Sequence, residues 1–390
     1  MKLSRKCWQK IVLGIETSCD DTAVAILNSK REILAAERFT NRKIQQEIGG
    51  ISPIVCAEQH RKHLPILIEK CIFDAGISKN ELDAIAVTST PGLVIALKEG
   101  IGKAIQLARD LNRPLIPVHH MRAHALSIYL SEYASTIKFP FSTFLISGGH
   151  ALIAIAKSAE EFELYGKSLS GSPGECLDKV AREISIPSEY SGIHAGAAIE
   201  KLAENAETDG YLKYAAVLPS TSGADMQFSQ LKSTYLNLAR KRREDSDFSV
   251  ENFCASLQHS VAAHISSKLH SFFEQNSSNQ LVVGGGVAAN QYIFNAIQKV
   301  AKFYNCETFQ VPLRLCSDNA EMITLTGLMM LELGSSSIIP PDKIPDTIYA
   351  HARTEIGIDC RHKITPKPSK RLIISTINGH QPIRFSYNRK

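Results

Sequence analysis

Two short stretches decide the fold that this sequence predicts. Residues 11–27 read I-V-L-G-I-E-T-S-C-D-D-T-A-V-A-I-L, and residues 141–156 read F-S-T-F-L-I-S-G-G-H-A-L-I-A-I-A. Each contains an apolar run, a turn of small or polar residues and a second apolar run, which is the pattern of a β-hairpin. The competing interpretation is a coincidence between two common hairpins. Two hairpins of one plan predict two similar α/β domains.

Helical and strand patterns follow each hairpin. Alternating segments of the two kinds are typical of layered α/β proteins. Helical periodicity covers residues 58–73, 100–111, 175–184, 199–205, 253–274 and 290–303, and strand patterns cover residues 82–89, 115–118 and 281–283.

The positive charge is concentrated at the two ends of the chain. The 390 residues include 44 Lys and Arg against 39 Asp and Glu, a net charge of +5. Residues 1–10 hold four basic residues and no acid, and residues 361–390 hold eight and no acid, so residues 11–360 carry 32 − 39 = −7. A short presequence and an ordinary terminus both fit residues 1–10. Residues 340–390 read as a basic, Pro-containing tail.

Composition excludes several classes of protein. No run of about 18 apolar residues occurs, so we expect no membrane-spanning helix and no membrane partner. The nine cysteines are scattered without a C-x-x-C pair, which argues against a zinc ribbon or a thioredoxin-like motif. A chain this long needs no disulfides, so a reducing compartment fits it better.

The stretch His120-Met-Arg-Ala-His124 is the first candidate site. On a helix, the spacing of four places both imidazoles on one face, where they form a metal-binding pair. Two core or surface histidines remain the alternative. Met121 stands where a zinc protease of the H-E-x-x-H type has its general base. Asp318 is a third candidate ligand, although the sequence alone favours it as the cap of the helix near Met322.

Glycine-rich turns are the second kind of candidate. Residues 284–290 match G-x-G-x-x-A between a strand and a helix, and Glu307 lies at a suitable distance for a ribose-binding acid of a dinucleotide site. A tight turn without a ligand is the alternative. The turn at 147–150 can wrap phosphate oxygens with backbone N–H groups. Asp20 and Asp21, in the first hairpin turn, can orient a metal, a water or an amine.

Eight motifs occur in order along the chain. They are G-I-E-T-S-C-D-D-T (14–22), T-P-G-L-V (90–94), P-V-H-H-M-R-A-H (117–124), L-I-S-G-G-H (145–150), P-G-E-C-L-D-K (173–179), F-S-Q-L-K (228–232), G-G-V-A-A-N (285–290) and C-S-D-N (316–319). Together they resemble the tRNA N6-adenosine threonylcarbamoyltransferase family, formerly the O-sialoglycoprotein endopeptidases. The resemblance covers residues 11–335, and L-D-K-V-A-R-E-I-S (177–185) resembles the mitochondrial branch.

The resemblance implies a fold and a reaction. The fold is α/β, with two ribonuclease-H-like (actin- or sugar-kinase-like) domains flanking a nucleotide and metal cleft. Residues 11–135, joined by a helix at about 320–335, would form the N-terminal domain, and residues 136–319 the C-terminal one. The reaction transfers threonylcarbamoyl from L-threonylcarbamoyl-adenylate to N6 of the adenosine beside the anticodon, in mitochondrial tRNAs that read ANN codons, and releases AMP.

The resemblance also implies roles for particular residues. His120, His124 and Asp318 would hold one divalent metal ion, iron or zinc. Asp20 would orient the attacking amine or take its proton. The substrate-binding residues would be Leu145, Ile146, Ser147, Gly148, Gly149, Asp178, Gly196, Glu200 and Asn290. The chain departs from the family pattern at Arg122, Ser170, Gly171, Ala195, Gln227 and Gln230.

Partners and location follow from the same resemblance. We expect tRNA and an adenylate supplied by a separate synthase, action in the mitochondrial matrix, and a homodimer as one oligomeric state that fits. The alternatives are a non-catalytic adenine-nucleotide-binding module of ATPase type, a metalloprotease and a dinucleotide-dependent oxidoreductase.

Overall fold

The computed structural model describes residues 10–41, 44, 50–184, 186, 190, 193, 195–242, 244–365, 373–374 and 383–384. The chain divides into two compact units. The first contains the described residues up to Thr136, with Ser158–Glu161 and Ser317–Ile356. The second contains Ile137–Lys157, Phe162–Cys316 and the described residues from Gly357 onward. Apart from Lys10, the expected presequence lies outside the described residues, as does most of the tail after Thr365.

The first unit is built on a five-stranded sheet with the order β3-β2-β1-β4-β5. β1 and β2 pair antiparallel and confirm the hairpin predicted at residues 11–27, whereas β1, β4 and β5 run parallel. The carboxyl ends of these three strands therefore meet at one edge of the sheet. The strands are β1 (Ile11–Glu16), β2 (Thr22–Asn28), β3 (Ile33–Phe39), β4 (Ala84–Thr90) and β5 (Leu115–His119).

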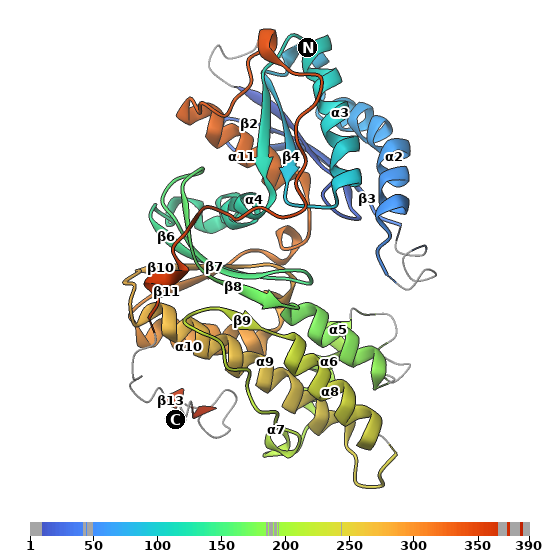
Figure 1. Ribbon diagram of the computed structural model, residues 1–390. Helices are drawn as coiled ribbons and strands as arrows, with labels where there is room; N and C mark the ends of the chain where they lie inside the picture. The colour runs from blue at the N-terminus through green and yellow to red at the C-terminus, as the bar shows by residue number, and fades with distance from the viewer. Residues whose placement is uncertain are drawn as a thin grey trace. The chain divides into compact units, whose positions relative to one another are not determined.

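Helices cover both faces of this sheet (Figure 1). α2 (Pro53–Asp74) and α3 (Val94–Asp110) pack on one face, where Leu13 and Ile15 join their apolar side chains. α11 (Ala320–Leu333) packs on the other face, against β1 and β2. A Cβ atom on Gly327 would lie 2.6 Å from Cβ of Ala86, so glycine allows α11 to lie close to the sheet. The short helix α4 (His120–Leu126) follows β5 directly.

The second unit repeats the strand order of the first. Its main sheet has the order β11-β10-β6-β7-β8-β12, in which β6, β7 and β8 are antiparallel neighbours and β6, β10 and β11 are parallel. The hairpin predicted at residues 141–156 is confirmed. The strands are β6 (Phe141–Ile146), β7 (Ala151–Ala156), β8 (Phe162–Ser170), β9 (Met226–Gln227), which pairs with β8, β10 (Gln280–Gly284), β11 (Glu307–Gln310) and β12 (Ile358–Asp359).

The core of the second unit lies between its sheet and its helices. α9 is buried along nearly its whole length, and its apolar residues join Phe144 and Ile153 of the sheet in one cluster. The helices are α5 (Pro173–Glu183), α6 (Ala195–Glu204), α7 (Gly210–Lys213), α8 (Ser229–Arg242), α9 (Val250–Phe273) and α10 (Gln291–Phe303). A short ribbon of β13 (Ile373–Ile374) and β14 (Ile383–Arg384) completes the described chain.

The α/β fold with two ribonuclease-H-like domains is confirmed, because each unit has an antiparallel hairpin and third strand beside two parallel strands in the same order. The segment after residue 340 is also packed in part. Ile344 is buried in the core of the first unit, and Cys360 and Ile364 are buried in the core of the second. Among the described residues, no helix is both long and apolar enough to cross a membrane.

Candidate metal centre and nucleotide-binding residues

The two histidines of the H-x-x-x-H stretch meet at the start of α4. His120 is the first residue of that helix, so His124 lies one turn further on the same face. Both are buried, and their Nε2 atoms lie 3.2 Å apart. Two ring nitrogens that converge in this way can act together as ligands of one metal ion.

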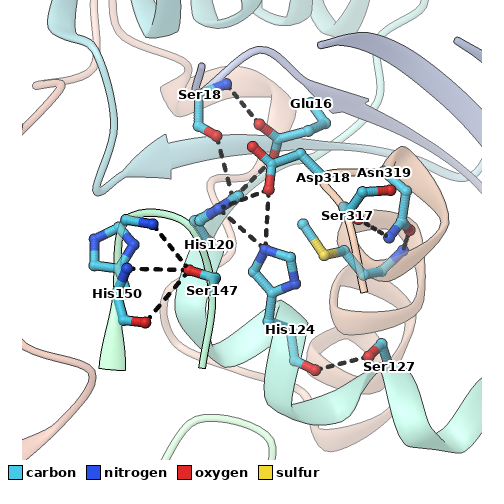
Figure 2. Close-up of polar contacts among 12 residues, drawn as sticks. Glu16, Ser18, His120, His124, Ser127, Ser147, His150, Ser317, Asp318 and Asn319 are labelled. Atoms are coloured by element: carbon cyan, nitrogen blue, oxygen red, sulfur yellow. Dashed lines mark hydrogen bonds and ion pairs between the residues drawn. The ribbon is translucent and has the colours of Figure 1, made fainter. Parts of the chain in front are cut away.

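Asp318 completes this arrangement. Its Oδ1 lies 3.1 Å from Nε2 of His124 and 3.4 Å from Nε2 of His120 (Figure 2). The sequence favoured Asp318 as the cap of the following helix, and that prediction is wrong. Asn319 is the cap of α11, because its Oδ1 accepts a hydrogen bond of 2.9 Å from the backbone N–H of Met322. One residue therefore caps the helix while its neighbour faces the histidines.

We call His120, His124 and Asp318 the His2Asp group. One donor atom from each lies within 4.8 Å of the others, and within the described part of the chain these three residues are the group that could hold a metal ion. Two imidazole nitrogens and one carboxylate oxygen suit zinc or iron and leave coordination positions for other ligands. The residues present therefore fit a divalent metal ion.

The electrostatics of the group also favour a cation. Burial alone would raise the pKa of the Asp318 carboxyl, but the charge and hydrogen bonds of the imidazoles hold it well below its ordinary value. Burial lowers the pKa of His120, and the carboxylates of Asp318 and Glu16 more than reverse this effect, so that its pKa is raised. Two carboxylates at one buried imidazole stabilise positive charge there.

Glu16 also belongs to the site, although no sequence pattern indicated it. It is the last residue of β1, it is fully buried, and its Oε2 lies 3.2 Å from Nδ1 of His120. Nothing in G-I-E-T-S distinguishes this Glu from a polar residue at a strand end. The signal lies in the topology, because β1, β4 and β5 are parallel neighbours and their carboxyl ends lie together.

The turn that carries Asp20 and Asp21 is fixed by α2. Gln59 Nε2 donates 2.6 Å to the Asp20 carbonyl, and His60 bonds the Cys19 carbonyl through Nε2 at 2.9 Å. Burial raises the pKa of the Asp21 carboxyl to about 6, and Thr40 donates a hydrogen bond that opposes the rise. Asp20 and Asp21 thus belong to a defined turn after β1.

The S-G-G-H turn of the second unit follows β6. Its Ser147 hydroxyl oxygen accepts hydrogen bonds from the N–H groups of Gly149 (3.3 Å) and His150 (3.0 Å). The Gly174 N–H, at the start of α5, donates 3.2 Å to the Ser147 carbonyl. Two of the amides expected to wrap a phosphate therefore already bond Ser147. Leu145 and Ile146 are buried residues of β6, and a Cβ on Gly148 or Gly149 would meet no atom within 4 Å.

The other predicted substrate-binding residues lie on helices of the second unit. Glu200, on α6, accepts 2.6 Å from the backbone N–H of Gln291, where α10 begins. Burial raises the pKa of the Glu200 carboxyl. Asn290 caps α10 and also donates 3.3 Å to Gln258. Asp178 lies on α5 and pairs with Arg182 at 2.9 Å, and Gly196 lies in the first turn of α6.

A cavity of about 290 Å³ lies beside Glu200. Tyr211, Gln258 and Tyr292 line it together with acidic residues of α6. Tyr292 OH lies 2.6 Å from Nδ1 of His259, which stabilises one wall. The structure thus brings Glu200 and Asn290 to the start of α10, next to a cavity with aromatic walls.

The departures from the family pattern have local explanations in part. Arg122 donates from Nε to the Ile356 carbonyl at 2.7 Å, so its side chain bonds the C-terminal segment of the first unit. Gly171 has φ +68°, and a Cβ there would lie 2.9 Å from Ser229 Oγ, so this position favours glycine over an acid. Ser170 Oγ bonds Ser229 Oγ at 2.7 Å. Ala195 begins α6, Gln227 ends β9 and Gln230 lies on α8.

The dinucleotide interpretation of the glycine loop fails on geometry. Glu307 begins β11 and pairs with Gln280, the first residue of β10, whereas the glycine run starts at Gly284, the last residue of β10. A ribose-binding acid has to lie at the carboxyl ends of the strands, near the glycine turn. Glu307 lies at the opposite end.

The fold and the donor set together define the class. The chain is an actin-like α/β protein whose first unit holds a His2Asp group, with two buried histidines and a partly buried aspartate, that suits a divalent metal ion.

Comparisons with known proteins identify the family. The sequence model described as tRNA N6-adenosine threonylcarbamoyltransferase matches residues 32–325. A Caenorhabditis elegans protein named as the probable mitochondrial enzyme is 58% identical over 96% of this chain and 90% of its own. The mitochondrial enzyme of Homo sapiens is 35% identical over 83% of this chain and 82% of its own.

One solved structure agrees with the fold alone. The T. kodakarensis HypF structure has a TM-score of 0.52 at 15% identity and covers 86% of this chain and 49% of that one. The sequence comparisons decide the family. This chain belongs to the tRNA N6-adenosine threonylcarbamoyltransferase family, and it is an acyltransferase that modifies tRNA with a threonylcarbamoyl group.

Proposed function

We propose that this chain transfers threonylcarbamoyl from L-threonylcarbamoyl-adenylate to N6 of the adenosine beside the anticodon, in mitochondrial tRNAs that read ANN codons. The observation that carries this proposal is the convergence of His120, His124 and Asp318 in a chain of this family. The names of the relatives support the mitochondrial location, for which we propose the matrix.

The reaction exchanges one bond for another at the carbamoyl carbon. The N6 amine attacks that carbon, and a C–N bond forms. The C–O bond to the adenylate phosphate breaks, its electron pair leaves with AMP, and N6 loses one proton. A bound divalent metal ion supplies polarisation of phosphate and carbamoyl oxygens and offsets the charge of the leaving group.

Residues of the first unit would hold the metal ion and direct the amine. His120, His124 and Asp318 would be its ligands, with iron and zinc as the ions that suit this donor set. Asp20 would accept a hydrogen bond from the N6 amine or take its proton. The bonds from Gln59 and His60 to its turn support this role, because a group that orients an amine has to be held in place.

Residues of the second unit would bind the adenylate. Its adenosine would contact Asp178, Gly196, Glu200 and Asn290. Its phosphate would lie against the backbone of Leu145 to Gly149. The cavity beside Glu200 supports this assignment, because its tyrosine walls can pack against an adenine ring. A separate synthase would supply the adenylate, and a homodimer is compatible with this function.

A reconstituted assay tests the proposal. The assay combines the full chain with a threonylcarbamoyl-adenylate synthase, ATP, bicarbonate, threonine and a tRNA that reads an ANN codon. The nucleosides of the tRNA are then measured by mass spectrometry. We expect threonylcarbamoyladenosine, and its loss with His120→Ala. No product in the presence of a working synthase and metal ions would overturn the proposal, and adenine-nucleotide binding without product would favour the non-catalytic module.

A further inference from the structure

Glu16 is a buried carboxylate that the proposed chemistry does not use directly. Its side chain has no solvent exposure, and two hydrogen bonds hold it besides the contact with His120. Its Oε1 accepts 2.5 Å from the backbone N–H of Ser18, and its Oε2 accepts 2.5 Å from Thr88 Oγ1. Burial of an unpaired carboxylate carries a large desolvation penalty, which partners have to offset. Such a group needs an explanation.

Strand topology aims Glu16 at one nitrogen of His120. Glu16 ends β1, Thr88 lies near the end of β4, and His120 follows β5, all at the same edge of the sheet. The Oε2 atom of Glu16 lies 3.2 Å from Nδ1 of His120, while Nε2 of the same ring faces Asp318 and His124. The two ring nitrogens therefore have different partners (Figure 2).

We propose that Glu16 is a positioning residue that fixes the tautomer and the ring orientation of His120. An ionised carboxylate only accepts hydrogen bonds, so His120 Nδ1 has to carry the proton in this contact. Nε2 then carries no proton when a metal ion is bound, and its lone pair would serve as the ligand of that ion. A carboxylate behind a metal-ligating histidine commonly has this effect.

The neighbouring hydrogen bonds explain why Glu16 can act in this way. The Ser18 N–H and the Thr88 hydroxyl leave the carboxylate little freedom, so that its position follows the backbone of β1 and β4. Ser18 Oγ also lies 3.3 Å from His120 Nδ1 and would bond the same nitrogen. The proposal rests on the metal-binding role proposed above for His120.

Metal affinity tests the proposal without relying on turnover. The full chain is stripped with a chelator and titrated with Zn²⁺ against a chromophoric competitor. We expect Glu16→Gln to bind Zn²⁺ roughly 10–100-fold more weakly than the wild type, because the amide N–H₂ can donate to Nδ1 and favour the wrong tautomer. In a His120→Ala background the same substitution should change affinity little. An equal loss in both backgrounds, or no loss in either, would overturn the proposal.

Asp83→Asn is the matched control. Asp83 Oδ2 accepts 2.8 Å from the backbone N–H of Ile11, at the opposite end of β1. The substitution again replaces a carboxylate that holds this strand, but far along it from His120. We expect unchanged Zn²⁺ affinity. A loss as large as that of Glu16→Gln would mean that any weakening of β1 lowers metal affinity, and the positioning role would be rejected.

Nitrogen NMR of the wild type decides the question even if Glu16→Gln does not fold. In the Zn²⁺-loaded protein, the His120 ring should show a protonated Nδ1 and a metal-bound Nε2. A metal-bound Nδ1 or a protonated Nε2 would overturn the proposal. If the wild type binds no metal ion, the metal role in the proposed function and this proposal both fail, whereas normal binding with unchanged Glu16→Gln affinity rejects this proposal alone.

Discussion

Adjacent residues have separate roles at the N-terminus of α11. Asp318 faces the two histidines, and Asn319 caps the helix. Both are short polar side chains in one loop, so a pattern that detects a cap cannot say which of them is the cap. The difference between the two roles can be measured with one substitution at each position.

Asn319→Ala and Asp318→Asn should give opposite results. Loss of the Asn319 cap should lower the free energy of unfolding by about 0.5–2 kcal/mol and leave Zn²⁺ affinity nearly unchanged. Asp318→Asn should weaken Zn²⁺ binding at least tenfold, because it removes an anionic ligand. A tenfold loss corresponds to about 1.4 kcal/mol of binding free energy. Urea unfolding and competitive Zn²⁺ titration measure the two effects. A stability loss confined to Asp318→Asn would reverse the assignment.

The sequence predicted parts of the candidate site to different degrees. The histidine pair is visible because its residues are one helical turn apart in the chain. Asp318 is 194 residues from His124, so no local pattern could join them, and only the family resemblance did so. Glu16 needed the order of three strands, which a single sequence does not show.

The glycine loop after β10 offers a matched pair of substitutions at the scale of an element. Gly285 has φ +93°, and a Cβ there would collide with the carbonyl group of Ile146. Gly286 has no atom within 4 Å of such a Cβ. Gly285 is therefore required by the fold, whereas Gly286 leaves bare backbone in the loop that leads to Asn290, a residue proposed to contact the adenosine.

We expect Gly285→Ala to lower the free energy of unfolding by about 1–3 kcal/mol, because alanine is strained at this positive φ and its Cβ would collide with the Ile146 carbonyl group. Gly286→Ala should leave stability unchanged or raise it by up to about 1 kcal/mol. If the loop binds the adenylate, Gly286→Ala should nevertheless weaken AMP binding, measured by calorimetry. Unchanged AMP affinity would remove this loop from the proposed nucleotide site.

Lys268 gives α9 a pH-dependent contribution to stability. It is 3% exposed, and its Nζ donates to the carbonyls of Thr221 (2.7 Å) and Gly223 (3.3 Å). Burial lowers its pKa to about 8 from an ordinary value of 10.5. Between these values the unfolded chain holds more protons, so the contribution of Lys268 to stability rises with pH in that window.

Lys268→Met tests this dependence. As pH rises from 8 to 10.5, the unfolding free energy of the wild type should increase relative to that of the variant by up to about 3 kcal/mol, since each pKa unit corresponds to 1.36 kcal/mol. Urea unfolding followed by circular dichroism at several pH values gives this difference, and other titrating groups cancel in it. The exposed Lys201→Met on α6 is the control. A parallel pH profile for wild type and Lys268→Met would contradict the assignment.

Elements with local signals were predicted best. Both hairpins and most long helices follow from apolar periodicity and turn residues. The predicted start of α2 at residue 58 is late, because the helix begins at Pro53, where proline suits the first turn. β9 and β12 have two residues each and were not predicted. They exist because β8 offers a partner edge, and that pairing is a long-range event without a local pattern.

At the scale of the whole molecule, charge and packing divide the C-terminal segment. Arg361 bonds Asp359 and Asp225, and Ile364 is buried, so these residues belong to the second unit. Residues 366–390 add six basic residues and no acid, whereas residues 11–360 carry a net charge of −7. Removal of the chain from residue 366 therefore removes this positive charge together with the β13–β14 ribbon, and it spares the packed residues before position 366.

Deletion of residues 366–390 should weaken tRNA binding and reduce its salt dependence. Each phosphate contact that is lost lowers the slope of log K against log salt by about 0.7–0.9, so the loss of two or three contacts from six cations would change the slope by roughly 2. Fluorescence anisotropy with labelled tRNA at several salt concentrations measures it. A variant with these six residues changed to glutamine is the matched control for chain length, and it should behave like the deletion. An unchanged slope in both variants would mean that the positive charge of this segment does not bind tRNA.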